Sequence, residues 1–149
     1  MPLMVAGSGP ALLSVAARSA DTVALNPGLP MGSGDWQRGP TPFADVNDRK
    51  VEWIRGAAGA RFAALELQTS VLAGGITDGD PADRVQPMAS LLGVSPPQLA
   101  GSPHVLAGTA EQCVEAVRGW RERWGISYIT VPAALARELA PVVHALRDT

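Results

Sequence analysis

Apolar residues along this chain fall into short runs that alternate with longer amphipathic stretches. The short runs predict strands at residues 3–6, 22–25, 65–73 and 126–131. The stretches that repeat apolar residues at helical spacing predict helices at 10–20, between Asp45 and Gly59, and at 81–92, 109–124 and 133–146. Strand followed by helix therefore recurs four times, without a hairpin signal between neighbouring strands. This order predicts parallel strands joined by right-handed crossovers.

Helix boundaries are marked by residues with known capping preferences. Asp45 is a candidate N-cap with Phe43 packing back as a staple, and Asp80 closes a turn before Pro81. Thr109 and Gln112 have capping-box spacing. The positions predicted to face inward are Leu12, Leu13, Ala16, Ala17 and Ala20; Val46, Lys50 through its methylene stem, Trp53, Ile54 and Ala57; Cys113, Val117, Trp120 and Trp124; and Leu135, Leu139, Val142, Val143 and Leu146.

The repeated strand–helix order gives an α/β fold class and leaves two architectures open. Four units can form a small open sheet, or half of an eight-stranded (β/α) barrel, which takes about 250 residues in full. Function is expected at the carboxyl ends of the strands in both cases. Those ends are Gly7 to Gly9, Asn26–Pro27, residues 71–75 and Val131–Pro132.

The first strand leads into the clearest candidate binding site. Gly7, Ser8 and Gly9 follow it, and Pro10 opens the next helix at a position where its missing N–H costs nothing. Small residues let an anion approach the backbone, and the helix N-terminus supplies positive potential. The turn therefore predicts a phosphate site, although a tight strand-to-helix turn explains the same residues equally well.

A Gly/Pro-rich loop at 26–43 lies within the predicted domain. It lacks apolar periodicity, and we expect it to be poorly ordered at the ligand-facing end of the strands. Trp36 in this loop is the one tryptophan placed to cover a ligand, since the others fall on predicted helices.

Composition excludes several classes of protein. The 149 residues are enough for one domain, 1–149, and their formal net charge of -2 argues against a nucleic-acid partner. The arginines between Arg118 and Arg123 are interpreted as a solvated helix face. The single Cys113 rules out an internal disulfide, and no signal peptide or apolar run long enough to cross a membrane is visible. These features predict a cytoplasmic protein.

The sequence identifies no catalytic residue and no metal site. His104 and His144 are far apart, and one cysteine cannot complete a ligand set with them. His104 is interpreted as a surface or capping residue and His144 as a surface residue. Cys113 lies on a helical seam and is interpreted as a buried structural thiol.

Several strings in the chain resemble one enzyme family. VAGSGP at 5–10 with ALLSVAARSADTVALNP at 11–27 is similar to the fifth and sixth βα units of luciferase-like flavin and deazaflavin oxidoreductases. The run 49–73, RKVEWIRGAAGARFAALELQTSVLA, resembles the region of their seventh strand, and 102–132 resembles the run into the eighth. The resemblance is strongest to the coenzyme F420-dependent branch. It covers nearly the whole chain but only the C-terminal half of the family.

The resemblance implies the last four βα units of a TIM-type barrel that binds F420, or alternatively FMN, at its carboxyl face. It implies hydride transfer or monooxygenation on a small organic substrate, with the cofactor phosphate at Gly7, Ser8 and Gly9. The family's first four strands have no counterpart here, so the chain looks like an enzyme that lacks its front half.

Three hypotheses about function stay open. The chain is the half of an enzyme that works with a separate N-terminal half or as a homo-oligomer, a phosphate-binding module without turnover, or an inactive remnant. Open strand edges and an uncovered barrel interior predict self-association.

Overall fold

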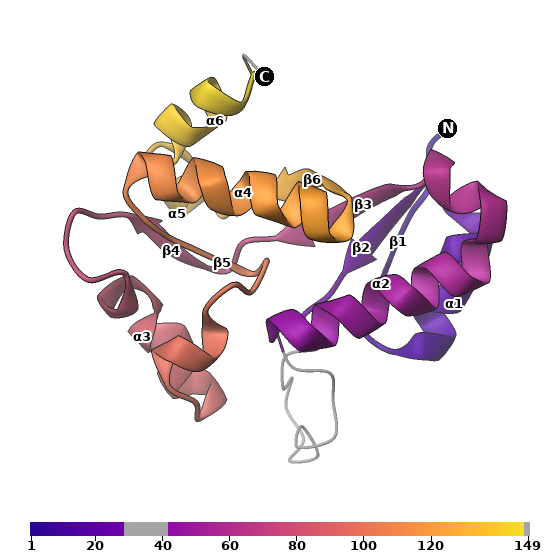
Figure 1. The fold of residues 1–149 in the computed structure, drawn as a ribbon, viewed down its shortest axis with the longest axis horizontal. Coiled ribbons are helices and arrows are strands. Elements are labelled where there is room, and N and C mark those ends of the chain that lie inside the picture. Colours follow the sequence, from indigo (N-terminus) through magenta and orange to yellow (C-terminus); the bar gives the residue numbers. More distant parts are fainter. Residues whose placement is uncertain (29–41, 148–149) are drawn as a thin grey trace.

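A four-stranded parallel sheet is the centre of the fold in the computed structural model, which describes residues 1–28 and 42–147 (Figure 1). The sheet order is β1 (Met4–Gly7), β2 (Thr22–Leu25), β3 (Glu66–Ser70) and β6 (Ile126–Thr130). Every neighbouring pair of these strands is parallel. The predicted α/β class, the parallel pairing and the approximate positions of the four strands are therefore confirmed.

The crossover helices pack on one face of this sheet. They are α1 (Pro10–Ser19), α2 (Ala44–Ala58), which continues into the 3-10 helix η2 (Gly59–Ala64), and α4 (Ala110–Trp124). Leu13, Ile54 and Trp124 from these helices meet Val23 and Leu67 from the strands in one apolar core. Because side chains alternate along a strand, the residues between these core positions point to the opposite face.

A second, two-stranded parallel sheet corrects the predicted third strand. The predicted run 65–73 ends as a strand at Ser70, and β4 (Ala73–Ile76) then pairs with β5 (Val105–Gly108). The chain between them forms α3 (Pro81–Leu92) and the 3-10 helix η3 (Pro96–Leu99). These elements enclose a separate small core around Val85, Leu92 and Leu99.

The last predicted helix, 133–146, is wrong as a single element. It is divided into α5 (Ala133–Ala136) and α6 (Ala140–Arg147). Pro141 explains the break, because proline has no N–H to donate to the carbonyl of Arg137 and its ring clashes there. Val143 is exposed as a result of this arrangement, whereas Leu139 and Val142 are buried as predicted.

Capping residues are confirmed with one exception. Asp80 caps α3, Thr109 and Gln112 form the capping box of α4, and Gly125 ends α4 in the left-handed conformation. Helix α2 instead begins two residues early, with Phe43 rather than Asp45 as its N-cap and Asp45 in its first turn. Most of the predicted loop 26–43, including Trp36, lies outside the described residues.

Candidate functional site

The carboxyl ends of the main strands lie at one edge of the sheet. The pairing aligns Gly7 with Leu25, Leu25 with Thr69, and Thr69 with Ile129. Ligands of parallel α/β folds bind at this edge, where loops and helix N-termini converge. The residues around these four positions therefore define the candidate site.

Gly7, Ser8 and Gly9 form the connection between β1 and α1 at this edge. Gly7 is buried, and a Cβ atom placed on it would lie 3.1 Å from Cγ of Leu12. Its carbonyl accepts a hydrogen bond of 2.9 Å from the N–H of Asn26 at the end of β2. Glycine at this position lets α1 pack closely against the strand and fixes the direction of the helix toward the edge.

The N-terminus of α1 has the form that an anion site requires. Gly9 is its N-cap in an extended conformation, no side chain caps the helix, and Pro10 occupies the first turn. The N–H groups of a first turn lack intrahelical acceptors, and the helix dipole makes this end positive. A Cβ atom on Gly9 would meet nothing within 4 Å, so Gly9 borders open space. The three predicted residues therefore lie together, while anion binding at them stays a prediction.

A hydrogen-bonded cluster of Gln68, Ser70 and Thr130 lies on the sheet face opposite the helices. Nε2 of Gln68 donates to Oγ1 of Thr130 at 2.9 Å and to Oγ of Ser70 at 3.2 Å. The two hydroxyl oxygens are 2.8 Å apart. In a complete barrel this face lines the interior. Sequence reasoning missed the cluster, although polar residues at alternate positions of LELQTS signal a polar strand face.

His104 is buried on the helix side of the same edge, which corrects its interpretation as a surface residue. It is 1% exposed, and its Nδ1 lies 3.1 Å from the carbonyl oxygen of Ser70 and 3.2 Å from Oγ1 of Thr69. Since a carbonyl can only accept, Nδ1 carries the proton. Nε2 is buried without a hydrogen-bond partner among the described residues. Burial lowers the pKa of His104 to about 4, so the ring is neutral.

Lys50 is also fully buried, beyond the burial of its stem that the sequence predicts. Its side chain is 0% exposed, and Nζ donates a hydrogen bond of 2.6 Å to the carbonyl oxygen of Asn26. Desolvation lowers its pKa to about 8. The lysine thus places its ammonium directly behind the carboxyl end of β2.

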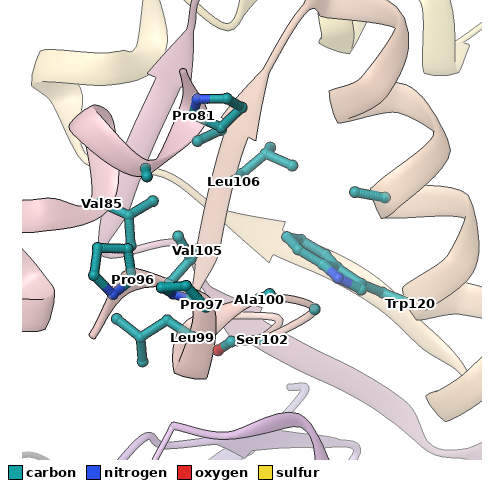
Figure 2. Close-up of a pocket in the computed structure, with 14 residues that line it drawn as sticks. Pro81, Val85, Pro96, Pro97, Leu99, Ala100, Ser102, Val105, Leu106 and Trp120 are labelled. Carbon is teal, nitrogen blue, oxygen red and sulfur yellow. The ribbon is translucent and has the colours of Figure 1, made fainter. Parts of the chain in front are cut away.

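An apolar cavity of about 310 Å³ lies between η3, β5 and α4 (Figure 2). Pro96, Leu99, Leu106 and Trp120 are among its lining residues. Its hydroxyl group, on Ser102, is already used in a hydrogen bond to the carbonyl of Pro42. Because the cavity offers few free polar groups and contains none of the predicted site residues, we do not assign a ligand to it.

The remaining residues with reactive side chains, Cys113 and His144, have a structural role or no assigned role. Cys113 is buried, and burial raises the pKa of its thiol, as expected for an inert cysteine. His144 is exposed as predicted. The described residues contain no group of three or more metal-ligating side chains and no helix long and apolar enough to span a membrane.

Neither a protein-family model nor a curated protein matches the chain, but solved structures do. The coenzyme F420-dependent tetrahydromethanopterin reductase from Methanopyrus kandleri matches with a TM-score of 0.58 and 12% identity, over 95% of this chain and 49% of that one. Monooxygenase RslO1 from Streptomyces bottropensis matches with a TM-score of 0.59 and 19% identity, over 99% and 48%. Riboflavin lyase RcaE, solved with modified FMN and riboflavin, gives 0.60 and 14%, over 98% and 42%.

These matches establish the fold. The neighbours are TIM-barrel enzymes of the luciferase-like type, so the resemblance seen in the sequence is confirmed at the level of the fold. The chain spans about half the length of each neighbour. Those neighbours are a coenzyme F420-dependent reductase, a monooxygenase and a riboflavin lyase.

Proposed function

We propose that the chain is the cofactor-phosphate half of a luciferase-like oxidoreductase that uses coenzyme F420 or a flavin such as FMN. The observation that carries the proposal is the uncapped N-terminus of α1 behind Gly7, Ser8 and Gly9, at the carboxyl edge of a half-barrel sheet. Both cofactors carry a phosphate, and a helix N-terminus with small residues is an established way to bind one.

The residues present fit a phosphate group. The position of a Gly9 Cβ atom is open space, and no carboxylate lies in the first turn of α1. The backbone N–H groups of Ser8 and Gly9 would hold the phosphate oxygens. The same turn would orient the rest of the cofactor along the edge toward β3 and β6.

Gln68, Ser70 and Thr130 would contact the ring or the substrate. Their hydroxyl and amide groups face the barrel interior at the carboxyl ends of β3 and β6 and are joined by hydrogen bonds that fix their positions. A preorganised polar surface of this kind can orient a small organic molecule without rearrangement. The bound cofactor supplies the hydride or oxygen chemistry, and the chain supplies binding and orientation.

A complete active site requires more than this half. The interior face of β1 and β6 is exposed at Met4 and Tyr128, where a full barrel would be closed by further strands. We therefore propose that turnover needs a complementary N-terminal half or a second copy of this chain. A phosphate-binding module without turnover would share the α1 site but would not need further strands to close the barrel.

The test compares FMN with riboflavin, which lacks the phosphate. Titrated by flavin fluorescence, the chain is expected to bind FMN more tightly than riboflavin. Gly9→Asp should remove this preference, because it adds a negative charge and a side chain at the site. Gly119→Asp is the matched control, since it adds the same group in open space on α4 and should leave the preference unchanged.

Equal affinity of the chain for FMN and riboflavin would contradict the phosphate assignment. Failure to bind either flavin or F420 would favour the hypothesis that the chain is an inactive remnant.

A further inference from the structure

Lys50 is the only lysine in the chain, and its buried ammonium has no counter-charge among the described residues. Its recorded hydrogen bond goes to a neutral main-chain carbonyl, that of Asn26. The ion pairs between described residues involve arginines and not this lysine. Burying an unpaired ammonium is costly, so its retention in the core calls for a compensating role.

The described residues around Lys50 do not supply a negative group either. On its own helix, Asp48 is used by Arg123 and Trp124, and Asp45 lies near Arg49. His104 responds to the charge of Lys50: its ring is neutral, and Lys50 lowers its pKa further. The positive potential of Lys50 is therefore free to act on something outside the described side chains.

The hydrogen bonds around Asn26 connect this charge to the turn between β1 and α1. The carbonyl of Asn26 accepts from Nζ of Lys50, and its N–H donates to the carbonyl of Gly7 at 2.9 Å. One residue thus links the ammonium to the turn. In a desolvated environment a charge acts over a longer range than in water, since little solvent screens it.

We propose that Lys50 is the buried counter-charge of the phosphate that Ser8 and Gly9 bind. Lys50 does not touch the phosphate. It attracts the anion through the protein interior and fixes the end of β2 beside the turn by its bond to Asn26. This proposal rests on the proposed function, because it assumes a phosphate at the N-terminus of α1.

Two variants separate the charge of Lys50 from its packing. Lys50→Met keeps the apolar stem and removes the charge, and Lys50→Arg keeps the charge. We expect the preference for FMN over riboflavin to fall about tenfold in Lys50→Met and to be retained in Lys50→Arg. Riboflavin affinity should stay the same in both variants. A loss of packing alone would instead weaken the binding of both flavins equally.

A measurement on the unaltered chain makes the test independent of whether the variants fold. Labelling lysine with ¹³C at Cε gives one NMR resonance, because the chain has a single lysine. Inorganic phosphate should raise the pH at which this resonance titrates in the wild-type chain. The same phosphate should have no effect in Gly9→Asp.

The outcomes distinguish the two proposals. If Gly9→Asp loses the FMN preference while Lys50→Met keeps it in full, the role of Lys50 is overturned and the phosphate site stands. If the wild-type chain has no FMN preference, the proposed function fails. A lysine resonance that is indifferent to phosphate overturns the inference about Lys50 in either case.

Discussion

Two basic side chains behind the carboxyl edge, Lys50 and His104, show how burial sets the charge of single residues. Both are buried without a carboxylate partner among the described residues, and desolvation lowers the pKa of each. The results differ because their ordinary pKa values differ. His104 becomes neutral across the physiological range, whereas Lys50, with a pKa of about 8, stays mostly protonated at neutral pH.

His104 makes stability depend on pH in the acid range. Its folded pKa of about 4 lies below the ordinary histidine value of 6.5, so the unfolded chain binds more protons between these two pH values. The free energy of unfolding should therefore fall as the pH is lowered from 6.5 to 4, by on the order of 3 kcal/mol from this residue.

His104→Asn isolates this contribution from the carboxylates. Asn can donate to the carbonyl of Ser70 as Nδ1 does, but it does not titrate. Urea unfolding measured at several pH values should give a shallower loss of stability for this variant between pH 6.5 and 4. Parallel pH profiles of variant and wild type would contradict the assignment.

The sequence could place these residues on elements but could not establish their burial. Lys50 shares a helical face with Val46 and Ile54, which predicts burial of its stem and leaves the ammonium free to reach solvent. The ammonium stays inside because the carbonyl of Asn26, distant in sequence, provides an acceptor. His104 follows a proline in a connecting segment, and nothing local indicates that it bonds to β3.

At the scale of elements, strong local signals predicted helices and strands correctly, and weak signals did not. Helix α4 has a capping box, an apolar seam and a terminal glycine, and all three are confirmed. Strand β4 was not predicted because it reads Ala-Gly-Gly-Ile, and its partner β5 lies in the segment after His104 that was interpreted as a connection. Glycines usually weaken a strand, so the pattern alone favoured a loop.

Gly74 is required by the pairing of β4 with β5. Its φ is +132°, and a Cβ atom there would lie 1.8 Å from the carbonyl oxygen of Leu106. Gly74→Ala should lower the free energy of unfolding by about 3 kcal/mol, because it combines backbone strain with a backbone clash. Chemical denaturation measures this change. Gly119→Ala, in open space on α4, is the control and should be neutral or slightly stabilising.

At the scale of the whole molecule, the sheet has two outer strands within the described part of the chain. They are β1 and β6 in the order β1-β2-β3-β6. Leu3 and Met4 at β1 are about half exposed, as are Leu12 and Val15 on the adjacent α1. The sequence predicted these open edges from the count of strands, but its prediction that Leu12 faces inward is wrong, because a sequence pattern does not fix which apolar side chains an edge exposes. That depends on how α1 lies against β1.

These edges predict that the isolated chain associates with itself. An unprotected parallel edge flanked by apolar side chains offers both hydrogen-bonding groups and a surface that water disfavours. Sedimentation velocity should therefore give species larger than a monomer, with a share that grows with concentration. Met4→Lys should shift the distribution toward the monomer, because a lysine on an edge strand opposes pairing.

Leu91→Lys, on α3 and 68% exposed, removes an equally apolar group away from the edge and should have no such effect. If both lysine variants behave alike, association does not proceed through β1. A complementary N-terminal half would cover the same edge, so its addition should convert the self-associated species into a one-to-one complex.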